Sequence, residues 1–160
     1  MTKSGSKVLK RRTPRGDWNP DLVFTFDIET WGLNAQNFAI GMIKNLSGTV
    51  SEKFHKKEDM RTFFNWAEDG SIFYAHNAEY DVAGLFDVEE FIDMEKIYPN
   101  RLIGAFYNCP KMSKEDDIET RKIQIRDSYS IFPTSLSKLG KDLGFGKGKT
   151  PQKFIDGIPT

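Results

Sequence analysis

Two carboxylates stand one residue apart in the stretch FTFDIET, residues 24–30. Apolar and polar residues alternate along this stretch, which is the two-residue period of a half-buried strand, so Asp27 and Glu29 point to the same side. Neighbouring carboxylates repel each other, and both stay ionised in a partly dry site only when positive charge lies between them. A divalent cation is the simplest candidate for that charge.

The segment YAHNAEYDV, residues 74–82, adds a third carboxylate. Asn77 and Asp81 are four residues apart at the start of a predicted helix, so both project on one face of it. His76 and Tyr80 form a second pair with the same spacing on an adjacent stripe. If the strand before this helix lies beside the first strand, the carboxylate of Asp81 approaches the first two, and three acids converge.

Hydrophobic periodicity predicts the elements that position these residues. An antiparallel three-strand meander comes first, and a further strand then pairs in parallel with it; a hairpin and flanking helices complete a mixed sheet of the α/β class. We expect strands at residues 23–28, 38–46, 47–55 and 71–77, helices at 56–68, 78–91 and 134–143, and a hairpin formed by 101–108 and 121–129 around an acidic, solvated loop at 113–120.

A length of 160 residues suits one domain, and 13 Phe, 5 Tyr and 3 Trp supply bulk for its core. No apolar run is long enough to span a membrane, and the N-terminus lacks the apolar region of a secretory signal. We therefore expect a cytoplasmic protein with no membrane partner. The single cysteine, Cys109, has no partner for an internal disulfide and no neighbouring zinc ligands, so we expect it to pack or to have no role.

The numbers of acidic and basic residues are equal, 23 of each, but the charge is unevenly distributed. Residues 1–20 hold six basic residues and one acidic residue. We expect a basic, disordered tail there, which either contacts nucleic-acid phosphate or is merely solvated. Residues 21–145 then form the domain, and 146–160 are a Gly/Lys/Pro-rich segment that acts as a linker or as a phosphate-contacting loop.

The two acidic motifs together resemble the first two exonuclease motifs of family B DNA polymerases, D-x-E on a first strand and then N-x-x-[FY]-D. The form YAHNAEYD and the downstream stretch at residues 123–144 are most similar to the protein-primed subgroup of small phages and linear plasmids. The resemblance covers residues 22–145. It implies a ribonuclease-H-like 3'-5' proofreading exonuclease domain that acts on the 3' end of single-stranded DNA.

The resemblance also implies a site with two Mg²⁺ or Mn²⁺ ions, which together activate the attacking water and stabilise the leaving oxygen. Asp27 would bridge both ions, Glu29 would bind the ion that carries the water, and Asp81 would hold the second ion. These three would be the catalytic and metal-binding residues. The residues implied to contact the terminal nucleotides are Thr30, His76, Asn77, Tyr80, Ser128 and Tyr129.

One part of the family pattern is missing. A third motif, Y-x-x-x-D, should follow on a further helix, and no such motif occurs in the sequence. Asp156 is no substitute, because position 152 is Gln and the context is rich in Gly and Pro. We therefore expect the isolated chain to be nearly inactive, with the third motif supplied by the rest of a polymerase or by a separate chain.

The same residues also have ordinary structural explanations. The first two acids can lie on a solvated strand face, Asn77 can cap a helix, and Asp81 can be an acid in the first helical turn. Three functions therefore stay open. They are a DNA 3'-5' exonuclease domain, a catalytically inactive module that binds single-stranded DNA or a replication or nuclease partner, and a ribonuclease-H-like enzyme that acts on RNA.

Overall fold

The computed structural model describes residues 19–32, 37–97, 102–110, 112–114, 117–119 and 121–145. Nearly all of the expected basic tail and the whole of the segment at 146–160 lie outside these ranges, so both remain predictions. Within the described part of the chain, no helix is long and apolar enough to cross a membrane.

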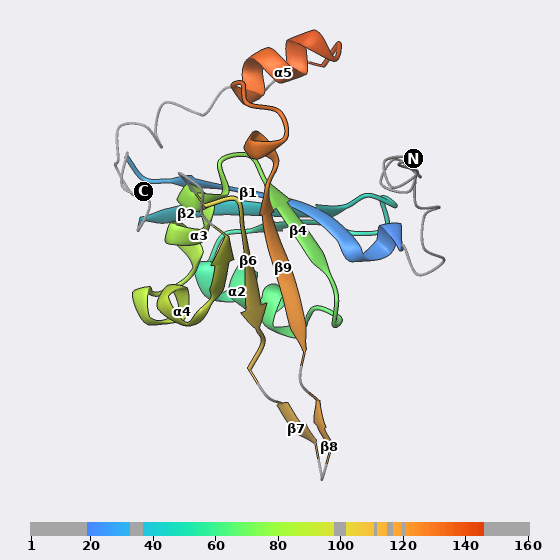
Figure 1. Ribbon diagram of the computed structural model, residues 1–160, viewed down its shortest axis with the longest axis vertical. Coiled ribbons are helices and arrows are strands. Elements are labelled where there is room, and N and C mark those ends of the chain that lie inside the picture. Colours follow the sequence, from blue (N-terminus) through green and yellow to red (C-terminus); the bar gives the residue numbers. More distant parts are fainter. Residues whose placement is uncertain are drawn as a thin grey trace, which may run out of the picture.

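A seven-stranded mixed sheet forms the centre of the domain (Figure 1). Its strands lie in the order β3-β2-β1-β4-β9-β6-β5. The first three make an antiparallel meander, β4 pairs in parallel with both β1 and β9, and β6 pairs antiparallel with β9 and β5. The predicted α/β class, with its meander, parallel strand and hairpin, is therefore confirmed. The strands are β1 Val23–Thr30, β2 Phe38–Asn45, β3 Ser51–Phe54, β4 Ile72–Ala75, β5 Glu95–Ile97, β6 Gly104–Asn108 and β9 Lys122–Asp127.

The helices α2 and α3 cover one face of this sheet. Phe24 and Phe26 of β1 point to that face and meet Phe63 and Phe64 of α2, with ring centroids 5.5 and 5.2 Å apart. Strand side chains alternate, so Thr25 and Asp27 point to the opposite face of the sheet. The helices are α2 Lys57–Trp66, α3 Ala78–Leu85, α4 Val88–Asp93 and α5 Leu136–Asp142, with short 3₁₀ turns at Pro20–Leu22 and Ser128–Ser130.

The single helix predicted over 78–91 is wrong, because the structure has two helices there. Phe86 is extended, with φ −114° and ψ 143°, and α3 ends before it. Asp87 then begins α4, and its backbone N–H donates to the carboxylate of Glu90 at 3.0 Å, which is the reciprocal bond of a capping box. A helix-start signal thus interrupts an otherwise periodic stretch.

Two further differences concern the hairpin. The loop between β6 and β9 contains a two-stranded ribbon, β7 Met112–Lys114 and β8 Asp117–Glu119, which projects from the bottom of the domain in Figure 1. β5, a three-residue strand at the edge of the sheet, was not predicted. Such a short strand has too few residues to show a period.

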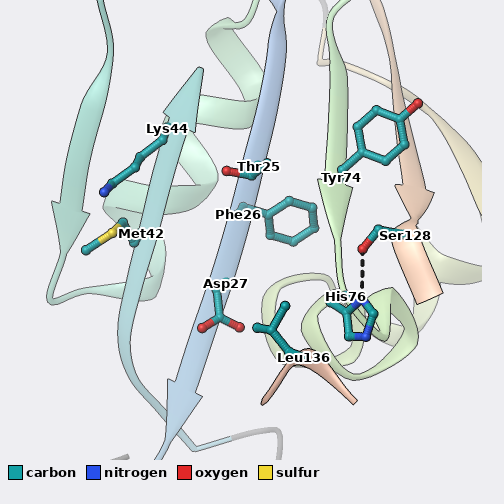
Figure 2. A pocket seen from close by; sticks show the side chains of 9 residues that line it. All are labelled: Thr25, Phe26, Asp27, Met42, Lys44, Tyr74, His76, Ser128 and Leu136. Atoms are coloured by element: carbon teal, nitrogen blue, oxygen red, sulfur yellow. Dashed lines mark hydrogen bonds between the residues drawn. The ribbon is translucent and has the colours of Figure 1, made fainter. Parts of the chain in front are cut away.

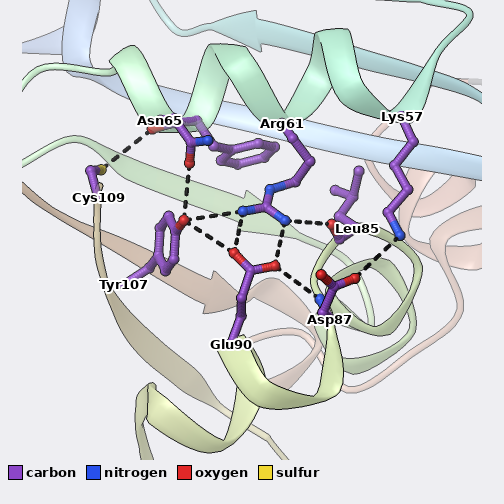
Figure 3. Close-up of polar contacts among 9 residues, drawn as sticks. Lys57, Arg61, Asn65, Leu85, Asp87, Glu90, Tyr107 and Cys109 are labelled. Atoms are coloured by element: carbon purple, nitrogen blue, oxygen red, sulfur yellow. Dashed lines mark hydrogen bonds and ion pairs between the residues drawn. The ribbon is translucent and has the colours of Figure 1, made fainter. Parts of the chain in front are cut away.

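An arginine network joins α2, α4 and β6 on the covered side of the sheet (Figure 3). The guanidinium of Arg61 donates to both carboxylate oxygens of Glu90, at 2.7 and 2.5 Å, to the carbonyl of Leu85 at 3.0 Å and to the hydroxyl of Tyr107 at 3.0 Å. Burial alone would raise the pKa of Glu90, but the hydrogen bonds and the charge of Arg61, with the hydrogen bonds from the Asp87 N–H and the Tyr107 hydroxyl, together lower the pKa below its ordinary value. The network therefore holds the end of α3 and the start of α4 against α2.

Candidate active site

Asp81 lies at the edge of β1, beside the backbone between Asp27 and Glu29. β4 pairs with β1 only along Val23–Thr25 before the chain turns into α3. Past that point the backbone N–H of Ile28 has no strand partner on this edge, and it donates instead to Oδ1 of Asp81 at 3.0 Å. The two acidic segments, more than fifty residues apart in sequence, thus meet through a hydrogen bond between a backbone N–H and a side-chain carboxyl group.

This position is electrostatically unfavourable for a third negative charge. Asp81 is 2% exposed. Burial, followed by the charge of Asp27, raises the pKa of Asp81 to about 8, although the Ile28 N–H opposes the shift. Glu29 contributes to the same rise. At neutral pH this carboxyl group therefore holds a proton unless positive charge is brought near it.

The charges of the three carboxylates affect one another, but their side chains are not already arranged as a set of metal ligands. Within the described ranges, no three His, Cys, Asp or Glu side chains are grouped closely enough to hold a metal ion as they stand. The chemistry of the donors nevertheless fits Mg²⁺ or Mn²⁺, because all three are carboxylates, the hard oxygen ligands that these ions prefer. The raised pKa of Asp81 fits too, since a nearby cation would offset both the burial and the repulsion from Asp27 that cause it.

Asp127, at the end of β9, fixes the start of α3. Its Oδ1 accepts the backbone N–H groups of Asn77 at 2.8 Å, Ala78 at 3.2 Å and Tyr129 at 3.1 Å. Asn77 occupies the N-cap position in the left-handed region, with φ 70° and ψ 56°, and its own side chain makes no capping hydrogen bond. The capping acceptor is therefore Asp127, a residue that the sequence reasoning missed. An Asp followed by Ser near the end of the strand predicted over 121–129 was the available signal.

His76, Ser128 and Tyr129 come together where β4 and β9 end. Nε2 of His76 donates to the carbonyl of Thr134 at 2.6 Å, and Nδ1 is hydrogen-bonded to the hydroxyl of Ser128 at 3.0 Å (Figure 2). The ring of Tyr129 lies 5.4 Å from that of His76. Both nitrogens of the imidazole are thus engaged, and its orientation is fixed.

Thr30 and Tyr80 form a second contact between the two motifs. Their hydroxyl oxygens are 2.5 Å apart, and that of Thr30 also donates to the carbonyl of Gly32 at 3.2 Å. Thr30 is 3% exposed, so its side chain faces Tyr80 and not solvent. The pair holds the end of β1 against α3.

A pocket of about 280 Å³ extends from Asp27 to His76 and Ser128 (Figure 2). It is lined by Asp27 of β1, His76 after β4, Ser128 after β9 and Leu136 at the start of α5. This pocket lies on the face of the sheet opposite α2, because Asp27 points there. A small polar group or a nucleotide end can therefore reach the exposed carboxylate of Asp27 and the fixed imidazole from the same side.

Comparison with solved structures identifies a known arrangement of these elements. The fold resembles a region of phi29 DNA polymerase. Against phi29 DNA polymerase complexed with single-stranded DNA, the TM-score is 0.60 at 12% identity, over 86% of this chain and 26% of that chain. Against the same polymerase with primer-template DNA and incoming nucleotides, the TM-score is 0.63 at 12% identity, over 81% and 24%. This chain thus spans about a quarter of the length of the polymerases that it matches.

At this identity the likeness to phi29 DNA polymerase establishes the fold alone. The mixed sheet and its flanking helices are an arrangement that this chain shares with a region of phi29 DNA polymerase. No protein-family model matches the sequence, and no curated protein matches it either. The chemistry of the site must therefore be argued from its own residues.

Proposed function

We propose that this chain is the 3'-5' exonuclease domain of a protein-primed family B DNA polymerase, and that it acts on the 3' end of single-stranded DNA. The observation that carries the proposal is the hydrogen bond from Ile28 to Asp81, which sets a buried carboxyl group beside Asp27 and Glu29 of β1. Burial, followed by the charge of Asp27, raises the pKa of Asp81 to about 8, and perturbed pKa values of this kind are typical of functional sites.

Asp27, Glu29 and Asp81 are proposed to hold two Mg²⁺ or Mn²⁺ ions. When bound, the ions would activate a water molecule and stabilise the leaving oxygen of a phosphodiester. Other side chains of the protein are proposed to bind and orient the terminal nucleotides. Both nitrogens of His76 are engaged by Thr134 and Ser128, so we propose that His76 meets the terminal nucleotides with the face of its fixed ring.

The nucleotide-contacting roles implied by the resemblance also belong to this proposal. The ring of Tyr129 lies 5.4 Å from that of His76 and is tilted by 60° against it, and we propose that a terminal base stacks on Tyr129. Asn77 lies at the start of α3, at the point where Asp127 fixes the turn. Thr30 and Tyr80 support each other, so we propose that Tyr80 meets the nucleotide and Thr30 orients it. A protein of this kind would work in the cytoplasm, that of the host cell if it is phage-encoded.

The site is proposed to be incomplete in this chain. The motif Y-x-x-x-D is absent from the sequence, and it would be supplied by the rest of a polymerase or by a separate chain. This absence, together with the lack of a preformed ligand group among the described residues, favours a second candidate function. In that case the domain is a catalytically inactive module that binds single-stranded DNA or a replication or nuclease partner.

An exonuclease assay tests the first candidate. A 5'-labelled single-stranded oligonucleotide is incubated with the chain and Mn²⁺, alone and together with a candidate partner chain that contains the motif Y-x-x-x-D. We expect little shortening with the chain alone and stepwise shortening from the 3' end in the mixture, which the Asp27→Ala, Glu29→Ala double variant abolishes. Shortening that survives in the double variant would refute the site assignment. A ribo-oligonucleotide of the same sequence tests whether RNA is the substrate.

Metal titration separates the two candidates. The exonuclease requires saturable Mn²⁺ binding that the double variant loses, measured by calorimetry. Single-strand binding without measurable Mn²⁺ binding supports the inactive module instead. The matched control is Asp142→Asn, which removes an exposed carboxylate on α5 and should change neither measurement.

A further inference from the structure

One face of the sheet is uncovered in the described part of the chain. α2 and α3 pack on the other face, where Phe24, Phe73 and Ile125 point. Register places the intervening side chains of five adjacent strands together on the uncovered side. We call this surface the open face, and its central residues are Thr25, Lys44, Tyr74, Phe106, Gln124 and Arg126.

Polar side chains surround two half-buried aromatic rings, those of Tyr74 and Phe106, at the centre of the open face. Thr25, Lys44 and Arg126 are exposed, whereas Gln124 is half-buried. Parallel strands that are covered by helices on both faces carry near-continuous runs of Val, Ile and Leu. On this side β1 and β9 depart from that composition, whereas β4 contributes Ile72 and Tyr74. The open face is therefore less apolar than a sheet face that is covered by helices.

Aromatic rings and cations alternate across the same surface. Tyr74 stands between the pocket of about 280 Å³ and a second pocket of about 270 Å³, and it lines both. Gln124 holds the guanidinium of Arg126: Oε1 of Gln124 accepts hydrogen bonds from Nε of Arg126 at 3.0 Å and from Nη2 at 2.6 Å. Nη1 of Arg126 lies 3.5 Å from the Tyr74 hydroxyl. Phe106, two strands away, carries the ammonium of Lys122 at 5.1 Å from its ring.

Two of these cations have no counter-charge in the part of the chain that the structure describes. Among the described residues, neither Lys44 nor Arg126 has a carboxylate within ion-pair distance, in contrast to Arg61 on the covered side, which pairs with Glu90. Exposed cations that flank aromatic rings fit a chain of phosphates and bases. A flat ring stacks on any base, and a nearby Lys or Arg neutralises the phosphate next to it.

We propose that the open face is a binding platform for single-stranded nucleic acid. Bases stack on Tyr74 and Phe106, and Lys44 and Arg126 contact the phosphates. The first pocket joins Tyr74 to His76 and Asp27, so the platform leads the strand toward the candidate active site. The proposal goes beyond the proposed function, because the platform requires neither metal ions nor a 3' end.

A circular single-stranded oligo(dT) tests the platform, since it has no 3' end. Its binding is measured by fluorescence anisotropy in EDTA, which removes any contribution from divalent ions. We expect the wild-type chain to bind, and Tyr74→Ala or Phe106→Ala to weaken binding about tenfold, as loss of one stacked base does. Arg126→Gln should lower the slope of log K against log salt by about 0.7, the value for one phosphate contact on a single strand.

Lys56→Gln is the matched control. Lys56 is exposed at the start of α2, on the covered side of the sheet, and its removal changes the net charge by the same amount as Arg126→Gln. It should alter neither the affinity nor the salt slope beyond the small effect of net charge. Circular dichroism and thermal melts establish that each variant is folded, and photocrosslinking of 4-thiothymidine-substituted circles maps the contact to Tyr74 or Phe106 independently of any substitution.

Three results would overturn the proposal. The first is binding of linear but not circular DNA, which would restrict recognition to the 3' end. The second is unchanged affinity and salt slope in folded Tyr74, Phe106 and Arg126 variants. The third is crosslinking confined to residues off the open face, the outcome expected if a helix of a protein partner covers this surface instead. None of these results depends on exonuclease activity, so the platform and the proposed function can fail separately.

Discussion

Oδ1 of Asp81 accepts the backbone N–H of Ile28 at 3.0 Å. The pairing of β4 with β1 stops where the chain turns into α3. Beyond that point the side chain of Asp81, from the second motif, takes the place of a strand partner for β1, which carries the first motif. The carboxyl group is consequently buried next to Asp27, and its pKa rises to about 8. Several measurable consequences depend on this one contact.

Asp81→Asn should stabilise the protein at pH 8 and above. The folded pKa of Asp81 is about 8 and the unfolded value is 3.8, so the native state binds a proton that the unfolded state releases between these values. The stability contributed by Asp81 is therefore fully present below pH 3.8, falls as pH rises and is lost above pH 8. Asn is neutral at every pH and can still accept the Ile28 N–H.

Urea denaturation at pH 5 and pH 8.5 measures this effect. We expect the difference between the variant and the wild type to grow by a few kcal/mol from the lower to the higher pH. The control is Asp142→Asn on α5, where the carboxylate is exposed and the difference should stay constant. A pH-independent difference for Asp81→Asn would contradict the raised pKa.

Mn²⁺ should raise the melting temperature of the wild-type chain at pH 7.5 more than that of Asp81→Asn. A cation can bind the ionised carboxylate only after its proton leaves, so binding should release a proton. Calorimetry in two buffers with different ionisation enthalpies measures that release. Equal thermal shifts in the two proteins, or heats that do not depend on the buffer, would argue against Asp81 as a ligand.

The order of the main elements could be predicted from the sequence, because each carries a clear period. The alternation around Phe24 and Phe26 predicts β1, and the helical spacing of Met60 and Phe64 predicts α2. The break between α3 and α4 could not be read in this way. It depends on Asp87, whose helix-start signal lies inside a stretch that also fits one longer helix.

The candidate site was predictable in its residue types but not in its contacts. The spacing of Asp27 and Glu29 alone indicates that they share a face. The bond between Asp81 and Ile28 depends on where β4 leaves the sheet, which is a tertiary property. Asp127 was missed because it accepts the N–H groups of a turn in which Asn77 is left-handed. No local sequence pattern predicts that conformation.

Asp127→Ala should destabilise the fold by about 2–3 kcal/mol, because it removes the acceptor of three backbone N–H groups in a buried turn. Asp127→Asn keeps one oxygen and should cost less. Ser130→Ala, which removes a hydroxyl bonded to the carbonyl of Asp127, is the control for the same turn. Chemical denaturation gives the values, and equal stability of Asp127→Ala and Ser130→Ala would show that Asp127 does not hold the start of α3.

Asn77→Gly separates a backbone role from a side-chain role at that position. Glycine adopts φ 70° without the cost of a Cβ, so the variant should be at least as stable as the wild type. Asn77→Val, with a branched Cβ, should instead lose about 1–3 kcal/mol. If the amide contacts the terminal nucleotides, Asn77→Gly should also weaken binding of a linear 3'-ended oligonucleotide and leave binding of the circular one unchanged. Weakening of neither would assign Asn77 to the turn alone, and weakening of both would mean that Asn77 affects strand binding without recognising the 3' end.

Arg61 and Glu90 should show a coupling energy of about 1–3 kcal/mol in a double-mutant cycle with Arg61→Met and Glu90→Gln. Their side chains are 15% and 27% exposed, so the pair is screened less than a surface salt bridge. Because the pKa of Glu90 is lowered, its contribution is present above the ordinary value of 4.5 and is lost as pH falls through the folded pKa. The coupling measured at pH 7 should therefore shrink at pH 3. A coupling that is the same at both pH values would mean that the pair contributes through packing and not through charge.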